Sequence, residues 1–290
     1  MKRIVVTGSN GQLGNELKVA SQLYPGVQFY FTDIAELDIC DEKAVAAFFE
    51  VNSIDLVINC AAYTAVDRAE EEPELCYRIN RDAVGILGAA ANQYNAGMIH
   101  VSTDYVFNGE HHVPYNETDP VQPASVYGKS KLAGEEELLR VKPDAVIVRT
   151  SWLYSSFGAN FVKTMLKLGS ERDELKVVFD QVGSPTYAAD LASALLTIAM
   201  KGAAIPGIYH YSNEGVCSWY DFTLSILAKA GLTCRVVPIE SHEYPAKTPR
   251  PHYSVLNKAK IKSVYDITIP HWEDGLNRCL SALTPSNPPH

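Results

Sequence analysis

The sequence predicts an α/β fold, in which a doubly wound parallel sheet is joined to a smaller, loop-rich C-terminal part. In the first half, short β-branched runs alternate with helical stretches, the pattern of a parallel sheet covered on both faces. Runs such as Ile-Val-Val and Leu-Val-Ile are apolar throughout, as expected when both faces of a sheet are buried. The alternation loosens after Arg149, and proline, glycine and aromatic residues gather in the stretches 107–123, 181–187 and 240–253.

The elements follow from this pattern in chain order. Strands are expected over residues 3–7, 28–32, 56–59, 98–102 and 146–149. Helices are expected to begin near Gln12, Asp41, Glu74 and Ser125, and a further helix over 188–201 is expected to return to the sheet. The proline-rich tail at 284–290 is expected to be frayed.

Composition narrows the class of partner. The chain has 290 residues and a net charge of −9 at pH 7, which disfavours nucleic acid or an anionic membrane as the main partner, because both attract cationic proteins. Apolar runs are shorter than a membrane span, and the N-terminus enters a strand without room for a signal peptide. The six cysteines form no C-x-x-C pair and read as reduced core thiols. We therefore expect a cytoplasmic protein.

A glycine-rich turn follows the first strand. Positions 7–14 read Thr-Gly-Ser-Asn-Gly-Gln-Leu-Gly, directly after a strand and at the start of a helix. Gly8 allows a tight turn, Gly11 lets backbone amides approach a pyrophosphate, and Gly14 permits close helix–sheet contact. The helix N-terminus supplies an anion site, so the turn predicts a bound dinucleotide held by Gly8, Asn10, Gly11, Gln12, Leu13 and Gly14. The spacing is GxxGxxG, and a turn without a ligand is the alternative.

The sequence predicts two domains, of which the first contains this turn. Residues 1–150, to which residues 180–212 return, form a dinucleotide-binding domain. Residues 151–179 and 213–290 form a substrate-binding domain, because loops carried by a rigid scaffold are where binding residues collect.

The end of the second strand carries a carboxylate suited to a ribose. Asp33 can accept hydrogen bonds from the adenosine ribose and repels a 2′-phosphate, which favours NADH over NADPH unless a nearby Lys or Arg compensates. Asp38 and Ile39 follow and are expected to flank the adenine. Simple turn chemistry is the alternative for Asp33.

Two later strand ends add polar and small residues. Ala61, Ala62 and Tyr63 follow the third strand, and Ser102, Thr103 and Asp104 follow the fourth. Ligands collect at the carboxyl ends of strands in open α/β sheets, so these residues are expected to converge on the cofactor.

A tyrosine and a lysine stand four residues apart on the helix expected from Ser125. Positions i and i+4 share one helix face, so Tyr127 and Lys131 are expected side by side. A cation beside a phenol favours the phenolate and so lowers the phenol pKa from about 10 toward working pH. The pair predicts a proton donor, and the Thr103 hydroxyl can bond the same substrate oxygen. A lone Tyr-x-x-x-Lys usually marks a solvated helix face. Here the glycine turn and the strand ends favour a catalytic role for the pair.

Together these motifs resemble the extended short-chain dehydrogenase/reductases. That resemblance rests on the glycine pattern, Ala61-Ala62, Ser102-Thr103 and Tyr127-x-x-x-Lys131. A narrower resemblance, to the dTDP-4-dehydrorhamnose reductase family, runs from residue 1 to about 283 and is carried by the segments 11–14, 65–67, 102–107, 127–134, 149–152, 160–161, 180–186 and 250–251.

The resemblance implies a Rossmann-type fold, NADPH or NADH as cofactor, and reduction of the C4 ketone of dTDP-4-dehydro-L-rhamnose to dTDP-L-rhamnose. It implies Tyr127 as proton donor, Thr103 as the group that positions the carbonyl oxygen, and Lys131 as the group that holds the nicotinamide ribose. Asn80 is expected to support Lys131 through its backbone or a water. The substrate residues implied are Thr103, Asp104, Trp152, Asn160 and Arg250, the last paired with the diphosphate. For Trp152 plain core, and for Arg250 a surface salt bridge, are the alternatives.

Other functions are possible on the same scaffold. The related dehydratases carry a Thr-Asp-Glu triplet, whereas Thr103-Asp104 is followed here by Tyr105, so the second carboxylate is lacking. A C4 epimerase would use the same Tyr and Lys with tightly held NAD. A regulatory subunit resembling the methionine adenosyltransferase beta subunit would bind an enzyme partner instead. Some relatives are metal-bridged dimers, so a homodimer is among the expectations, but no complete set of acidic ligands is found and no metal is assigned.

Overall fold

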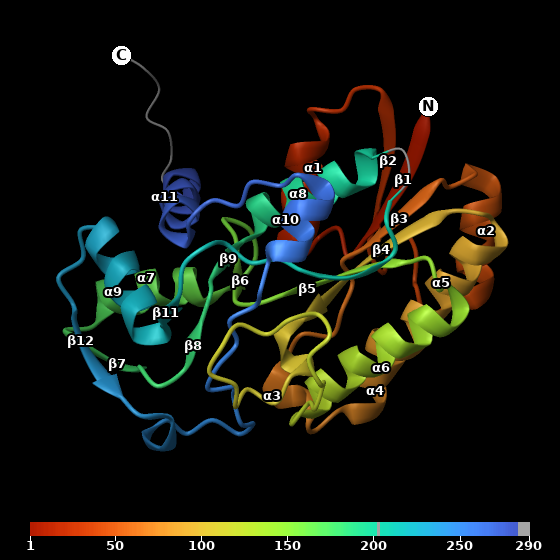
Figure 1. The fold of residues 1–290 in the computed structure, drawn as a ribbon. Helices are drawn as coiled ribbons and strands as arrows, with labels where there is room; N and C mark the ends of the chain where they lie inside the picture. Colours follow the sequence, from red (N-terminus) through yellow and green to blue (C-terminus); the bar gives the residue numbers. More distant parts are fainter. Residues whose placement is uncertain (202–203, 284–290) are drawn as a thin grey trace, which may run out of the picture.

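One six-stranded parallel sheet organises the first part of the chain. The computed structural model describes residues 1–201 and 204–283, so the expected frayed tail lies outside the described residues. The strands run in the order β10-β5-β4-β3-β1-β2 (Figure 1). Their bounds are β1 Lys2–Thr7, β2 Val27–Thr32, β3 Leu56–Asn59, β4 Gly97–Thr103, β5 Val146–Thr150 and β10 Gly207–His210. Strand order reverses at β1, which pairs with both β2 and β3, as in doubly wound sheets of the Rossmann type. The predicted fold class is confirmed.

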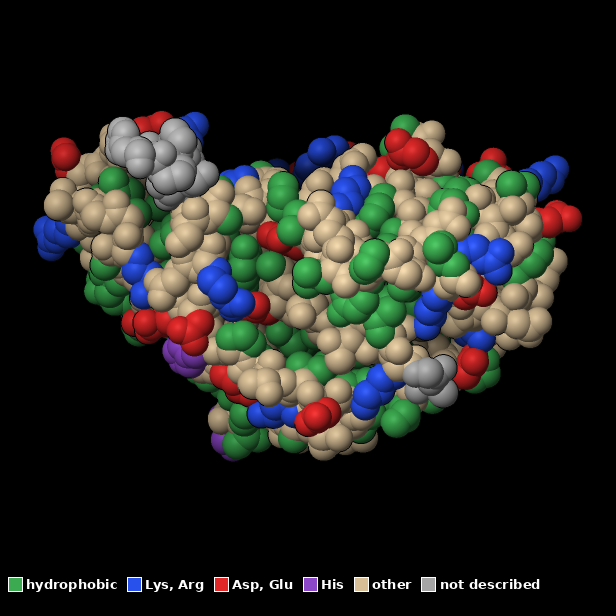
Figure 2. Space-filling model, turned by 90° about the horizontal axis from the view of Figure 1, so that it is seen from above, with side chains coloured by type: hydrophobic (Ala, Val, Ile, Leu, Met, Phe, Trp, Pro, Cys, Tyr) green, Lys and Arg blue, Asp and Glu red, His purple; other side chains and the backbone are tan. Residues whose placement is uncertain are grey.

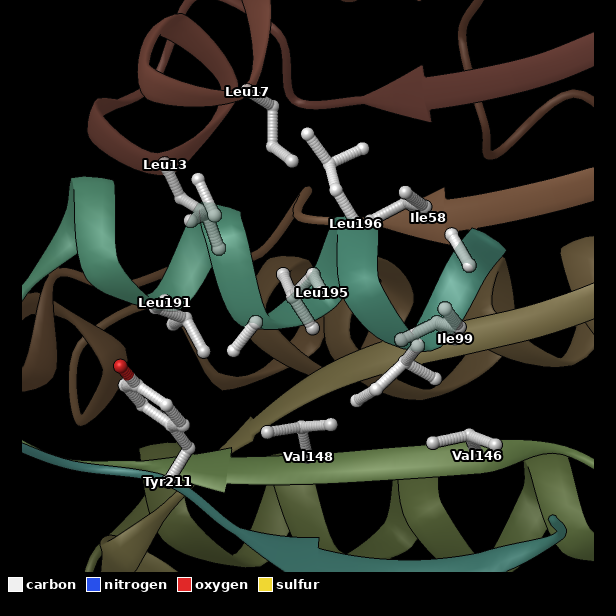
Figure 3. Close-up of a cluster of buried hydrophobic side chains, with 14 of the residues drawn as sticks. Leu13, Leu17, Ile58, Ile99, Val146, Val148, Leu191, Leu195, Leu196 and Tyr211 are labelled. Atoms are coloured by element: carbon white, nitrogen blue, oxygen red, sulfur yellow. The ribbon is translucent and has the colours of Figure 1, made fainter. Parts of the chain in front are cut away.

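Helices cover both faces of this sheet. On one face lie α1 (Gln12–Ser21), α8 (Ala188–Met200) and α10 (Ala259–Tyr265), and on the other α2 (Glu42–Asn52), α5 (Ala83–Gln93) and α6 (Val126–Val141) (Figure 1). Figure 3 shows Leu191 and Leu195 of α8 facing Val146 and Val148 of β5. The intervening Ile147 packs on the opposite face, so this strand buries apolar side chains on both sides.

The helix expected from Glu74 is built in three pieces. It consists of α4 (Pro73–Tyr77), a π-helical turn (Arg78–Asp82) and α5, which continue one another along the chain. Asn80 lies in the π turn and is completely buried. Sequence periodicity predicts the helix but not the π turn, because the turn depends on contacts made by Asn80 with distant residues.

The C-terminal half has more regular structure than the expected loops. Around a second apolar cluster pack α7 (Phe161–Glu171), α9 (Trp219–Lys229) and α11 (Trp272–Leu283), with a parallel pair formed by β7 (Glu174–Val178) and β12 (Arg235–Ile239). The stretch 181–187, expected as loop, contains β8 (Val182–Gly183) and β9 (Thr186–Tyr187), which pair with β11 (Cys217–Ser218) and β6 (Leu153–Tyr154). Short helices at Val66–Ala69 (α3), Asp104–Val106 and Ser241–Glu243 complete the chain. The boundary at residue 150 between two domains stays a prediction.

The charged surface and the cysteines of the structure can be compared with what the composition predicts. Acidic and basic side chains are interspersed over the face seen in Figure 2 rather than sorted by sign. Within the described parts of the chain, every helix is too short or too polar to span a bilayer. All six cysteines are free thiols, and Cys76, Cys217 and Cys279 are buried.

Candidate active site

A cavity of about 800 Å³ opens at the carboxyl ends of β1, β3, β4 and β5. Its wall brings together residues as far apart in the sequence as Gly8 and Ala159. From the predicted cofactor and catalytic residues it is lined by Gly8, Gly11, Gln12, Leu13, Gly14, Asp33, Asp38, Ile39, Ala61, Ala62, Ser102, Thr103, Asp104, Tyr127, Lys131 and Trp152. The cavity therefore lies where the strand order reverses, the usual ligand position in such sheets.

The glycine turn forms one end of the cavity. Gly8 has φ +64°, and the Gly11 amide donates to its carbonyl oxygen at 3.1 Å. A Cβ on Gly14 would run into the Gly8 carbonyl oxygen and the Ser9 backbone, so only glycine allows α1 to start this close to β1. The N-cap of α1 is Gly11, so its first amides are free to bind an anion. This end of the cavity fits a pyrophosphate.

The far end of the same wall is suited to an adenosine. The Asp33 carboxylate accepts hydrogen bonds from the backbone amides of Asn10 at 3.0 Å and Ile34 at 2.9 Å, which fixes it at the cavity wall. Asp33 therefore both stabilises the local turn through backbone hydrogen bonds and lines the cavity. Asp38 and Ile39 line the wall beside it, and so does Arg78, an exposed residue that sequence reasoning missed. No local signal marks Arg78, which reaches the cavity only through the π turn.

Helix α6 carries the tyrosine. The Ser125 hydroxyl caps the helix by accepting from the Gly128 amide at 3.0 Å, and Tyr127 follows with 9% of its surface exposed. Its ring meets Tyr105 edge to face, with centroids 5.4 Å apart. Burial raises the pKa of the Tyr127 phenol well above its ordinary value, with a smaller lowering by the Thr103 hydroxyl. The expected net lowering of the Tyr127 pKa is therefore wrong for the ligand-free protein, because burial is the largest influence on this phenol.

The lysine of the pair is buried and turned toward β4. Lys131 is 1% exposed, and its Nζ donates to the Val101 carbonyl oxygen at 2.8 Å and lies 3.2 Å from the His100 ring nitrogen Nε2. Burial lowers the pKa of Lys131 to about 8, offset in part by Glu135. Sequence reasoning missed His100, which looks like one more inward residue of a buried strand.

Thr103 and Asp104 stand where the fourth strand ends. The Thr103 hydroxyl donates to the Asp104 carboxylate at 3.0 Å and accepts from the Tyr105 amide at 3.2 Å. Asp104 is 4% exposed, and burial raises its pKa to about 7 against a smaller lowering by Thr103. Both side chains line the cavity beside Tyr127, as predicted from the strand-end argument.

A second, smaller cavity of about 250 Å³ shares part of this wall. Trp152 lines both cavities and stacks on Trp219, with ring centroids 3.5 Å apart and planes 6° from parallel. Its backbone has φ +48°, a conformation that a bulky residue rarely adopts. The Trp152 indole Nε1 donates to the Ser254 hydroxyl at 3.1 Å. The rest of the lining includes aromatic and cationic residues together with the Asp104 carboxylate, Gln181 and several aliphatic residues. The aromatic and cationic ones are Tyr105, Phe161, Lys176, Tyr244 and Arg250.

Several predicted site residues have structural partners in the ligand-free protein. Asn80 lies completely buried behind the wall, where its side-chain amide bonds the Tyr63 backbone and the Ser130 hydroxyl. Its expected support of Lys131 through the backbone or a water stays a prediction. Asn160 caps α7 by accepting from the Lys163 amide at 3.1 Å and donates to the Gln12 side chain at 2.9 Å.

Tyr63, Asn10 and Arg250 also have side-chain partners. The Tyr63 hydroxyl donates to Glu72 at 2.6 Å, and the exposed Asn10 side chain accepts from Lys18 at 3.1 Å. Arg250 lines the second cavity but forms a salt bridge with Asp67 at 2.7 Å. The expected diphosphate partner therefore already has a carboxylate, contributed by a segment 183 positions away.

Comparison with known proteins identifies the family. The family model described as RmlD substrate binding domain matches residues 1–284. The chain belongs to this family. SpsK, a spore coat polysaccharide biosynthesis protein of Bacillus subtilis, is 42% identical over 97% of each chain. The dTDP-4-dehydrorhamnose reductase of Aggregatibacter actinomycetemcomitans is 41% identical over 95% of this chain and 97% of its own.

A solved relative has the same architecture. The crystal structure of dTDP-4-dehydrorhamnose reductase from Bacillus anthracis in complex with NADP gives a TM-score of 0.92 at 39% identity, over 97% of this chain and 99% of that chain. The family resemblance inferred from the motifs is confirmed.

Proposed function

We propose that the protein is a nucleotide-sugar ketoreductase that uses NADPH or NADH to reduce the C4 ketone of dTDP-4-dehydro-L-rhamnose to dTDP-L-rhamnose. The relatives named dTDP-4-dehydrorhamnose reductase support the substrate, and the NADP of the Bacillus anthracis structure supports the cofactor. One observation carries the proposal: Tyr127 and Lys131 line the same cavity as the glycine turn that fits a pyrophosphate.

The chain provides a complete cradle for the cofactor. Gly8, Gly11 and the α1 N-terminus hold the pyrophosphate, and Asp33 accepts from the adenosine ribose. The bound cofactor supplies the hydride. Arg78 offers a cation on the wall of the same cavity as Asp33, which is the kind of compensation that a 2′-phosphate needs, so NADPH can be used as well as NADH.

Tyr127 serves as the proton donor to the ketone oxygen. Burial raises its pKa, so the phenol is protonated at working pH and holds a proton to give. A forming alkoxide is a still stronger base, and transfer to it is favourable. Thr103 positions that oxygen through its hydroxyl, and Lys131 binds the nicotinamide ribose from the buried side of the cavity.

The second cavity takes the nucleotide part of the substrate. Trp152 separates it from the cofactor cavity and presents an aromatic face to the sugar, while Lys176 and Arg250 supply positive charge for the diphosphate. In the ligand-free protein Arg250 is paired with Asp67, and the substrate diphosphate would be its partner in the complex. Free thiols throughout the chain support a reducing location, the cytoplasm, and a homodimer stays a prediction.

The test is consumption of NADPH with dTDP-4-dehydro-L-rhamnose, generated from dTDP-4-dehydro-6-deoxy-glucose by a 3,5-epimerase. Tyr127→Phe should lower kcat by about 10²- to 10⁴-fold while cofactor binding is retained, since only the proton donor is removed. Turnover near that of the wild type would exclude Tyr127 as donor. A folded wild-type protein that binds NADPH without consuming it would instead indicate a regulatory subunit, and a sample purified with tightly held NAD would indicate an epimerase.

A further inference from the structure

A chain of buried polar groups runs beneath the cavity and ends at Lys131. The Thr7 hydroxyl donates to the Asn59 side-chain oxygen at 2.7 Å, and the Asn59 nitrogen lies 3.0 Å from His100 Nδ1. The other ring nitrogen of His100 lies 3.2 Å from Lys131 Nζ. Thr7, Asn59 and His100 are completely buried, so the protonation pattern of this chain is set by its own donors and acceptors.

The orientation of the Asn59 amide fixes the tautomer of His100. The backbone amide of Ala61, which can only donate, lies 3.1 Å from the Asn59 oxygen, so that oxygen is the acceptor and the NH₂ group must face the histidine. The NH₂ group donates to Nδ1, which must therefore carry a lone pair. Burial keeps the pKa of His100 well below its ordinary value, so the ring is neutral and its proton is on Nε2.

This tautomer places an N–H group against Lys131. An ammonium has only donors, so it cannot accept from the His100 Nε2–H, whereas an uncharged amine accepts from it and still donates to the Val101 carbonyl oxygen. The other groups facing Lys131 are the thiols of Cys60 and Cys76 and the Glu135 carboxylate. That carboxylate is already paired with Arg149 at 2.6 Å.

We propose that His100, held by Asn59 as the Nε2–H tautomer, is a positioning residue that donates to Lys131 and favours its uncharged amine. The proposal deepens the reductase function and rests on it for its consequence. Protonation of Lys131 then requires its amine to leave the histidine, so the lysine exchanges between a form docked on His100 and a cationic form free to face the cavity. Cationic Lys131 is the form that favours a Tyr127 phenolate, so turnover falls as pH rises through the lysine titration.

The first test uses the ligand-free wild-type protein and does not depend on any activity. Two-bond proton–nitrogen spectra of protein labelled with ¹⁵N-histidine separate the two ring tautomers, and loss of a signal in His100→Gln assigns His100 among the eight histidines. An Nε2–H signal that persists across the neutral range is expected. An Nδ1–H signal, or a charged ring, overturns the proposal.

The second test reverses the tautomer. In Asn59→Asp a carboxylate oxygen would accept from Nδ1–H, which makes Nε2 an acceptor for a lysine ammonium. The titration of Lys131, followed by the ¹³C shift of its Cε in ligand-free protein, should move up by about one pH unit, tenfold in its dissociation constant.

The alkaline limb of the kcat profile should move in parallel. Thr7→Val is the matched control, because it removes a buried hydroxyl from the same chain but leaves Ala61 to orient Asn59. Its lysine titration should stay in place. Equal titration of Lys131 in wild type and Asn59→Asp overturns the proposal even where the reductase assay succeeds, and if Asn59→Asp does not fold, the wild-type histidine spectrum decides.

Discussion

Asp104 shows how burial alone can change the protonation of one side chain at the site. Its carboxyl is 4% exposed at the wall shared by both cavities, and burial raises its pKa to about 7. Near neutral pH a large fraction of Asp104 is therefore a neutral acid that can donate a hydrogen bond to a sugar hydroxyl, which an ionised carboxylate cannot do.

Replacement of Asp104 by asparagine should change how stability depends on pH. The folded-state pKa lies above the unfolded one, so between about pH 4 and 7 the folded protein binds more protons, and its stability falls as pH rises through that window. Asp104→Asn has no such titration and should gain stability relative to wild type by up to about 4 kcal/mol between pH 4.5 and 7.5.

Urea unfolding at a series of pH values measures this difference. Glu50→Gln, which removes an exposed carboxylate on α2, is the control and should run parallel to wild type. Parallel curves for Asp104→Asn as well would mean that Asp104 is ionised throughout.

At the scale of the element, α6, which carries Tyr127 and Lys131, approaches the π turn closely. A Cβ added at Gly134 would collide with the Asn80 carbonyl oxygen, which belongs to the backbone and cannot move aside cheaply. Gly134→Ala should therefore cost about 1–3 kcal/mol of unfolding free energy, because the helix must shift outward.

Activity should fall with it, since the same shift displaces Tyr127 and Lys131. Gly26→Ala is the matched control: a Cβ there meets nothing within 4 Å, and the change should be neutral or slightly stabilising. Denaturant midpoints and kcat of the two variants provide the comparison. Similar midpoints for the two would show that α6 has room to spare.

A second element-scale prediction concerns the Asn160 cap of α7. Asn160→Ala removes the acceptor for the Lys163 amide and should cost about 1 kcal/mol of unfolding free energy. Asn160→Asp keeps an acceptor oxygen and should retain most of that stability while losing the bond to Gln12. Substrate KM should be little changed in the Asp variant. A large rise of KM in that variant, without loss of stability, would support Asn160 as a substrate-binding residue.

The features that could be predicted from the sequence are those that depend on residues close together in the chain. Five strands of the sheet, the glycine turn and the spacing of Tyr127 and Lys131 depend on neighbouring residues, and these are found where they were expected. The sixth strand, β10, was not among the expected strands. The pKa direction of Tyr127 could not be predicted from Tyr-x-x-x-Lys, because it depends on burial by elements far away in the chain. The partner of Arg250 was equally hidden, since Asp67 belongs to a different part of the sequence.

For the whole molecule, the cofactor cavity links binding to stability. A ligand that binds only the folded protein stabilises it by mass action, so NADPH at about one hundred times its Kd should add about 2.7 kcal/mol to the unfolding free energy. Thermal unfolding with and without NADPH measures this. GTP, a nucleotide without the nicotinamide half, is the control and should give a smaller shift. Equal shifts would mean that the cavity recognises phosphates rather than a dinucleotide.

The position of β10 limits how the chain can be cut. This strand comes after residues 151–187, which contribute to the second apolar cluster. It nevertheless pairs with β5, from Val146 to Arg149, and the preceding helix α8 packs on α1. A fragment ending at Thr150 would leave β5 with an unpaired, apolar border, the kind of surface on which chains stack into aggregates. Any shortened version that is to avoid this aggregation must keep residues 188–210. A reporter protein is better inserted within residues 151–187 than fused after residue 150.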